Sequence, residues 1–303
     1  GLGDVYKRQA GLSSGLPFTF QDRSTNGVLT LHREPQGNLE LTASRDQEKA
    51  RLRLLWAFGS GAKGITPVGQ KDDGTWAESR LSWYRDRGSG GGFGLTTGAS
   101  RQEPQTPGES LGRSLAEREL SECFSCHTTG GLPQQARPAR HEMGIRCERC
   151  HGPGSVHVNA MRQPSAAGGT HIIHPGRLEP FAQVEMCGAC HGKPPRDDDF
   201  ALLQRIEKDP NTVRFPSQRL VLSRCYNEAS GGLKCTNCHD PHADVAAQSA
   251  SRDSGCLGCH SGQSGARPKR CPRAAANCAS CHMPKQRVMQ FSQFTDHWIR
   301  VVR

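Results

Sequence analysis

Apolar and polar residues alternate in short stretches through the first third of the chain. Four stretches stand between turn-forming residues, namely Phe18–Phe20, Gly27–His32, Leu39–Thr42 and Arg51–Phe58. Alternation with a period of two is typical of β-strands that bury one face. Residues 10–112 are therefore predicted to form a small β-rich region of strands and hairpins.

Two glycine-rich stretches interrupt this region. Residues 59–64 contain a lysine but lack the Gly-Lys-Ser/Thr order of a phosphate-binding loop, and residues 88–94 carry no such pattern either. Both stretches are expected to be plain loops, the first a tight turn between two strands.

The pattern changes from Ser114 onward, where loops dominate and apolar periodicity is weak. Short helices are predicted at Leu115–Cys123 and Gln183–Cys190. Residues 113–303 are expected to form a second domain of short helices and irregular loops, which contrasts with the β-rich region before it.

Twelve of the fourteen cysteines occur in pairs three positions apart, and a histidine follows the second cysteine of every pair. The six motifs are Cys123-Cys126-His127, Cys147-Cys150-His151, Cys187-Cys190-His191, Cys235-Cys238-His239, Cys256-Cys259-His260 and Cys278-Cys281-His282. This is the c-type haem attachment pattern, in which each thiol adds to one porphyrin vinyl group and the imidazole binds the iron. The sequence therefore predicts six covalently bound haems c.

Other uses of paired cysteines fit this pattern less well. Zinc sites share the Cys-x-x-Cys spacing, but they need no histidine after each pair, and histidine supplies only 13 of the 303 residues. Identical pairs three positions apart would be a poor disulfide framework for a chain of this length. Iron–sulfur clusters take four cysteines each and no trailing histidine. Haem is therefore favoured over all three.

The composition predicts an interior filled largely by cofactor. Apolar residues make up 34% of the chain, against roughly 45 to 50% in an average soluble protein, whereas each porphyrin is a large apolar plate. The formal charge of +10 falls to roughly +4 once the haems, each with about one net negative charge, are included. Arginines are expected to pair with haem propionates. Nucleic acid is not an expected partner, because no basic stripe is interleaved with aromatic residues.

Histidines outside the motifs are candidates for the second axial position of the irons. They are His32, His141, His157, His171, His174, His242 and His297. Their number suffices for bis-histidine coordination of six irons, which would leave no open site for a substrate and favours electron transfer over catalysis. His157, His242 and His297 each lie near a motif or in a short turn able to present an imidazole, and His141 and His174 are further candidates.

Methionine is the other common axial ligand. Five are present, namely Met143, Met161, Met186, Met283 and Met289. Met283 directly follows a motif histidine and is expected to pack against porphyrin instead. Cys225 and Cys271 stand outside the motifs, and a disulfide between them or two single structural thiols are equal alternatives.

These motifs resemble the multihaem cytochrome c superfamily that includes hydroxylamine oxidoreductase and the four-haem cytochromes that serve it. The similar segments are residues 144–154 with His157, residues 233–242, and residues 278–285 with residues 294–297. The resemblance implies a fold of haem-packed short helices and irregular loops. It also implies that His157, His242 and His297 bind haems other than those attached beside them.

Two departures weaken the resemblance to the catalytic members. No motif has lysine in place of its final histidine, as in the pentahaem nitrite reductases, and neither Tyr6, Tyr84 nor Tyr226 can be assigned as the crosslinking tyrosine of hydroxylamine oxidoreductase. We therefore expect an electron carrier that serves redox partner proteins, and assign no catalytic residue. The alternative is an oxidoreductase that acts on a small nitrogen or sulfur compound at one open haem.

The location of the protein follows from the chemistry of haem attachment. No apolar run is long enough to span a bilayer, and no secretory signal is visible. Because bacteria attach haem c outside the inner membrane, a periplasmic or extracellular protein is expected. Residues 4–9 can be encoded by a transposon end used in sequencing libraries, so residues 1–9 are expected to be translated adapter rather than a short natural tail. The signal peptide is then presumed lost by truncation.

Overall fold

The computed structural model describes residues 12, 15–85, 91–130, 137–139, 142–163, 171–196, 198–229, 232–243, 252–260, 276–289 and 291–301. The chain divides into two compact units. The first comprises Gly1–Pro153 with Met289–Ser292, and the second comprises Gly154–Val288 with Gln293–Arg303. The predicted adapter at residues 1–9 lies outside the described residues.

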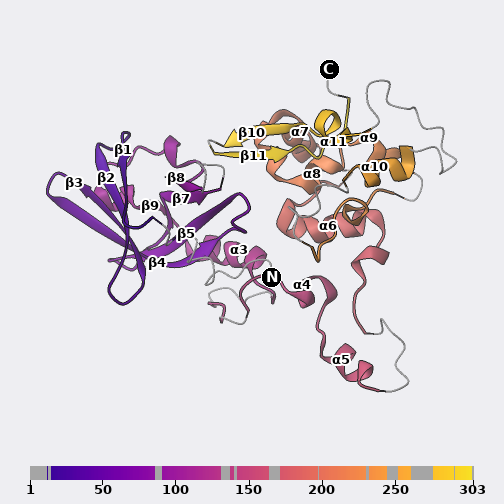
Figure 1. Ribbon diagram of the computed structural model, residues 1–303, viewed down its shortest axis with the longest axis horizontal. Coiled ribbons are helices and arrows are strands. Elements are labelled where there is room, and N and C mark those ends of the chain that lie inside the picture. Colours follow the sequence, from indigo (N-terminus) through magenta and orange to yellow (C-terminus); the bar gives the residue numbers. More distant parts are fainter. Residues whose placement is uncertain are drawn as a thin grey trace. The chain divides into compact units, whose positions relative to one another are not determined.

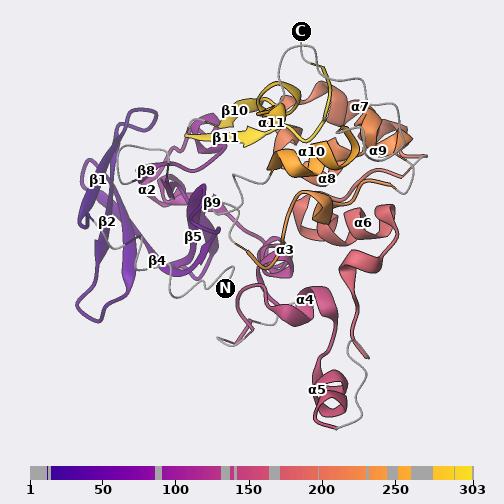
Figure 2. The same ribbon diagram turned by 45° about the vertical axis from the view of Figure 1, so that its right-hand side comes forward.

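The first unit is built on an antiparallel sheet of nine strands (Figures 1 and 2). The strands are β1 (Phe18–Asp22), β2 (Gly27–Arg33), β3 (Leu39–Arg45), β4 (Glu48–Phe58), β5 (Gly64–Lys71), β6 (Trp76–Ser79), β7 (Leu81–Tyr84), β8 (Gly92–Leu95) and β9 (Gly112–Ser114). Their order is β1-β2-β3-β4-β5-β6-β9, and β7 pairs with both β5 and β8. The four strands predicted from alternation are confirmed as β1 to β4, and residues 59–63 turn from β4 into β5 as expected.

A ladder of buried leucines determines the register of the long strands. Leu31 of β2 pairs with Leu41 of β3, which pairs with Leu52 of β4. All three side chains are buried. A slip of one residue would turn such a row to the opposite face of the sheet, so burial of these leucines selects one pairing.

A buried ion pair joins β1 to the loop between β6 and β7. Arg80 donates from Nε to Oδ2 of Asp22 at 2.5 Å, from Nη2 to the Ser24 hydroxyl at 2.8 Å and from Nη1 to the Ala99 carbonyl at 3.0 Å. Burial alone would raise the pKa of Asp22, but hydrogen bonds from Arg80 and Ser24 outweigh it and hold this pKa below its usual 3.8. The pair therefore stays charged inside the unit.

The first haem motif lies on a helix that packs into the core of this sheet. The helices of the first unit are η1 (Ala99–Arg101), α2 (Pro107–Ser110), α3 (Glu117–His127) and α4 (Cys147–His151). Leu120 and Phe124 of α3 are four positions apart and fully buried, so the helix presents one apolar stripe. Phe124 meets Trp56 of β4 edge-on at 5.1 Å between ring centroids. The composition change at residue 112 therefore does not coincide with the boundary between the units, because the first two motifs share a unit with the sheet.

The second unit consists of short helices and one hairpin (Figure 1). Its elements are α5 (Ser155–Met161), η2 (Pro175–Arg177), α6 (Pro180–His191), α7 (Phe200–Lys208), η3 (Pro210–Arg214), α8 (Pro216–Leu220), α9 (Arg224–Glu228), η4 (Cys235–Asn237), α10 (Arg252–His260), α11 (Cys278–His282), β10 (Lys285–Met289) and β11 (Ser292–Thr295). The helix predicted at Gln183–Cys190 is confirmed within α6, and the helix predicted at Leu115–Cys123 is confirmed from Glu117, where α3 begins; both helices continue to their motif histidine. No helix among the described residues is both long enough and apolar enough to cross a bilayer.

Apolar side chains are distributed unevenly between the units. In the second unit, the buried hydrophobic residues within the described ranges are Val184, Ile206, Val213 and Leu220, and polar groups such as Gln183, Arg219 and Asp296 are buried beside them. The large exposed apolar side chains also belong to this unit, namely Val156, Val158, Met161, Ile173, Phe200, Leu257 and Val301. The second unit thus has a thin polypeptide core and apolar surface that a large flat group could cover.

Candidate haem attachment sites

Each motif lies on a helical turn that presents its thiols and imidazole to one side. Helices α3, α4, α6, α10 and α11 all end at a motif histidine, namely His127, His151, His191, His260 and His282. Residues three and four positions apart share a helix face, which brings both cysteines and the histidine together. In the fourth motif the 3₁₀ turn η4 takes this role, and the backbone N–H of His239 donates to the Cys235 carbonyl at 3.0 Å.

The motif thiols are available for thioether bonds. None of the described cysteines takes part in a disulfide. No group of three or more histidine, cysteine, aspartate or glutamate side chains converges as a metal site within the part of the chain that the structure describes, whereas a structural zinc site closes four ligands around one ion. Separate pairs of thiols beside an imidazole fit covalent haem attachment. Cys271 lies outside the described residues, so its pairing with Cys225 stays a prediction.

Thiols of successive motifs interact in the second unit. Cys187 of the third motif shares a hydrogen bond with Cys235 of the fourth, which lowers the pKa of Cys187 to about 7 and, together with burial, raises the pKa of Cys235. Cys256 of the fifth motif and Cys278 of the sixth are also hydrogen-bonded. Burial, followed by the charge of Cys278, raises the pKa of Cys256 to about 11. The third motif therefore lies next to the fourth, and the fifth next to the sixth.

A buried glutamine reinforces the first of these pairs. Gln183 of α6 donates from Nε2 to the Pro175 carbonyl at 2.8 Å and to the Thr236 hydroxyl at 3.1 Å. Its Oε1 accepts from the backbone N–H of Thr236 at 3.2 Å. Because Thr236 stands between the two cysteines of the fourth motif, Gln183 joins the helix of the third motif directly to the fourth.

The first motif packs against the sheet of the first unit. The ring of His127 meets Phe58 of β4 in a T-shaped contact at 5.2 Å. Burial lowers the pKa of His127 and raises the pKa of Cys123 to about 11. The imidazole is therefore neutral at physiological pH, which is the form that binds a metal.

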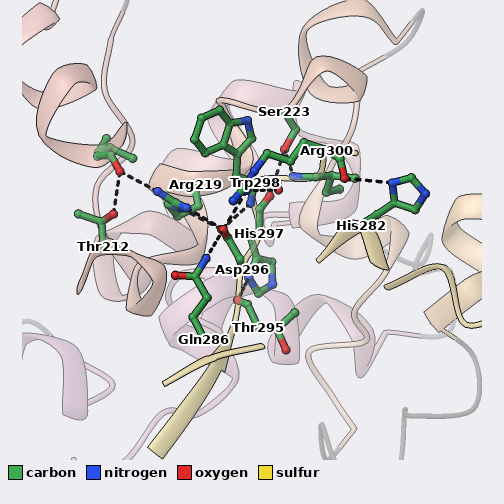
Figure 3. Close-up of polar contacts among 12 residues, drawn as sticks. Thr212, Arg219, Ser223, His282, Gln286, Thr295, Asp296, His297, Trp298 and Arg300 are labelled. Atoms are coloured by element: carbon green, nitrogen blue, oxygen red, sulfur yellow. Dashed lines mark hydrogen bonds and ion pairs between the residues drawn. The ribbon is translucent and has the colours of Figure 1, made fainter. Parts of the chain in front are cut away.

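Among the candidate distal ligands, His297 is held by hydrogen bonds to its ring and to its backbone (Figure 3). Its Nδ1 donates to the Thr295 carbonyl at 3.0 Å, and its own carbonyl accepts from the Ser223 hydroxyl at 3.1 Å. Burial lowers the pKa of His297 to about 4, so the ring is neutral. A metal-binding imidazole is commonly oriented through its other ring nitrogen, which leaves Nε2 for the metal. His282 is held in the same way, since its Nδ1 contacts the Arg300 carbonyl at 3.0 Å.

A buried carboxylate organises the turn that carries His297 (Figure 3). Asp296 accepts from Arg219 at 2.9 and 2.6 Å, from Arg300 at 2.9 Å, from Gln286 at 2.8 Å and from the backbone N–H of Trp298 at 3.0 Å. Burial would raise the pKa of Asp296, but these donors lower it further than burial raises it. Sequence reasoning missed this cluster because no spacing links residues 77 positions apart.

The remaining candidates lie in more varied surroundings. His157 is on α5, and His174 precedes η2. His242 is largely exposed, with Nδ1 3.1 Å from Asp240. His141 lies outside the described residues. His32 of β2 stands opposite Glu40 of β3, with Nε2 3.6 Å from its carboxylate, so it contributes to the sheet.

Comparison with known families bears on the first two motifs. Residues 97–152 match the family cytochrome c554 and c-prime. The match runs from just before η1 through both motifs of the first unit, and it supports a c-type cytochrome with haem-based electron transfer. No curated protein and no solved structure matches the chain.

Proposed function

We propose that this chain is a multihaem c-type cytochrome that binds six haems and transfers electrons between redox partner proteins outside the cytoplasm. Support comes from the six motifs on helical turns, from described motif cysteines that form no disulfide and from the family match over residues 97–152. The second unit has few buried apolar side chains and several exposed ones, and porphyrins that pack against them would complete its hydrophobic core. Kinship with hydroxylamine oxidoreductase and its four-haem cytochromes is part of the proposal.

The interaction between thiols of different motifs is the single observation on which the proposed function depends. A thioether bond places the porphyrin edge next to its sulfur. Cys187 is hydrogen-bonded to Cys235, and Cys256 to Cys278, so porphyrins attached at these sulfurs would be neighbours. Closely spaced haems suit the passage of electrons, because tunnelling weakens steeply with distance.

The residues of the chain divide this work among three roles. Motif cysteines fasten the porphyrins, motif histidines bind iron on one side, and histidines from elsewhere bind it on the other. Haem iron supplies reversible one-electron oxidation and reduction when bound. Side chains such as Phe58 keep water away from the ligating imidazole, which is expected to tune the potential of that haem.

The decisive experiment counts haems and tests for an open iron. Holoprotein matured in a host that attaches haem c should give six haems per chain by pyridine haemochrome assay and intact mass. A Cys187→Ala/Cys190→Ala variant should lose one haem, whereas the control Cys225→Ala, which alters a cysteine outside the motifs, should keep all six. Carbon monoxide and cyanide should leave the spectrum unchanged. A colourless protein would overturn the proposal, and ligand binding at one haem would favour the oxidoreductase alternative.

A further inference from the structure

The rings of His239 and His297 lie at a distance suited to a shared metal. Their ring centroids are 6.1 Å apart and their planes differ by 34°. His239 ends the fourth motif, and His297 follows β11 near the end of the chain. The two residues are distant in sequence, so the tertiary structure of the second unit alone brings them together.

The separation matches what two axial ligands require. With metal–nitrogen bonds of about 2.0 Å, as for zinc, and roughly 1.1 Å from nitrogen to ring centre, two imidazoles on opposite sides of one ion have centroids about 6.2 Å apart. Aromatic rings that pack against each other prefer offset or edge-on arrangements, with shorter or similar distances between their centroids. We favour ligation for this pair because both rings carry nitrogen atoms that can bind a metal.

The surroundings of His297 hold its ring in place before any metal binds. Nδ1 is committed to the Thr295 carbonyl at 3.0 Å, which leaves Nε2 as the ligating atom. Asp296 holds the backbone on the other side of the ring through the amide of Trp298 at 3.0 Å. Ser223 contacts both flanks of the turn, since its hydroxyl donates to the His297 carbonyl at 3.1 Å and accepts from the amide of Ile299 at 2.8 Å.

Building on the proposed function, we infer that His239 and His297 are the two axial ligands of one iron, that of the haem fastened to Cys235 and Cys238. Asp296 and Arg219 are positioning residues for His297. The haem beside which His297 lies in sequence, at the sixth motif, takes its distal ligand from elsewhere.

The first test asks whether His297 binds an iron at all. In His297→Ala holoprotein, one of the six haems should change from low-spin to high-spin in electron paramagnetic resonance, and added imidazole should restore it. His32→Ala, which alters a histidine of the sheet, should leave all six low-spin. If the six-haem protein keeps its spin state after His297→Ala, the inference fails while the proposed function stands.

The second test asks which iron His297 binds. Cys235→Ala leaves one vinyl group of the fourth haem unreacted, which shifts the absorption band of that haem to longer wavelength and marks it. Adding His297→Ala should move the marked haem to the high-spin state. The matched variant Cys187→Ala marks the third haem, whose spectrum should not respond. A response from the third haem instead would overturn the pairing.

A structure of the wild-type holoprotein gives the same answer if the marked variants do not accumulate. Nε2 of His239 and Nε2 of His297 should both be bound to one iron. Ligation of two different irons by these histidines would refute the inference.

Discussion

Arg219 binds Asp296 through two parallel hydrogen bonds, from Nε to Oδ1 at 2.9 Å and from Nη2 to Oδ2 at 2.6 Å. Both side chains are buried, at 4% and 0% exposure. The planar guanidinium matches the carboxylate in a way that a lysine could not. This pair joins α8 to the turn that carries His297, and so connects the stability of the second unit to the position of a candidate ligand.

Loss of that pair should be costly. Arg219→Ala leaves the Asp296 carboxylate without its main partner, and breaking a buried pair in this way typically costs about 3 to 5 kcal/mol. Urea unfolding followed by haem absorbance should show the loss, with Arg219→Lys intermediate. Arg224→Ala is the control, because its ion pair with Glu228 at 2.7 Å is exposed and should contribute nothing measurable. Equal urea midpoints for Arg219→Ala and Arg224→Ala would contradict a stabilising role for the pair of Arg219 and Asp296.

Acid should weaken the first unit through Asp22. The pKa of Asp22 is lower in the folded protein than its usual 3.8, so its stabilising effect is complete above that value and disappears as the pH falls through the folded pKa. In Asp22→Asn this dependence should flatten, although the variant is less stable at neutral pH because Arg80 loses its buried partner. The free energy of unfolding as a function of pH measures both effects. Parallel curves for the two proteins would exclude this role.

Phe124 should anchor the first motif to the sheet. Phe124 stands between the two cysteines of that motif in sequence and its ring is fully buried, so Phe124→Ala is expected to cost about 3 to 5 kcal/mol. Thermal unfolding should reveal the loss, and the haem count would show whether attachment at Cys123 and Cys126 suffers as well. Phe200→Ala serves as the control, because that side chain is 70% exposed. A stable, fully loaded Phe124→Ala protein would argue against packing of α3 on the sheet.

Two glycines of α10 offer a matched pair of substitutions. A Cβ at Gly255 would lie 2.6 Å from Sγ of Cys238 and 2.9 Å from the Asn237 carbonyl, whereas a Cβ at Gly258 meets nothing within 4 Å. Gly255→Ala should therefore displace the fourth motif and reduce haem content, while Gly258→Ala should keep the wild-type count. Intact mass measures both. Equal haem content in the two variants would mean that α10 does not press on the fourth motif.

Much of the candidate site could be predicted from the sequence, because its chemistry is local. On a helix, two cysteines three positions apart and the histidine that follows lie on one face, so the motifs can be recognised from the sequence without knowledge of the tertiary structure. Alternation likewise predicted β1 to β4, since each buries one face. Strands β6 to β9 escaped prediction because each has four residues or fewer, too few for a periodic signal.

Contacts between distant segments had to come from the tertiary structure. Composition suggested a break at residue 112, yet Phe124 inserts among Trp56 and Phe58, which ties the first motif to the sheet. The sequence alone determined which residues are candidates for holding haem, because the attachment pattern depends on spacing within one turn. Only the fold decided that Cys187 interacts with Cys235 and that the ring of His297 lies near that of His239, because such encounters depend on how the chain packs rather than on any pattern along it.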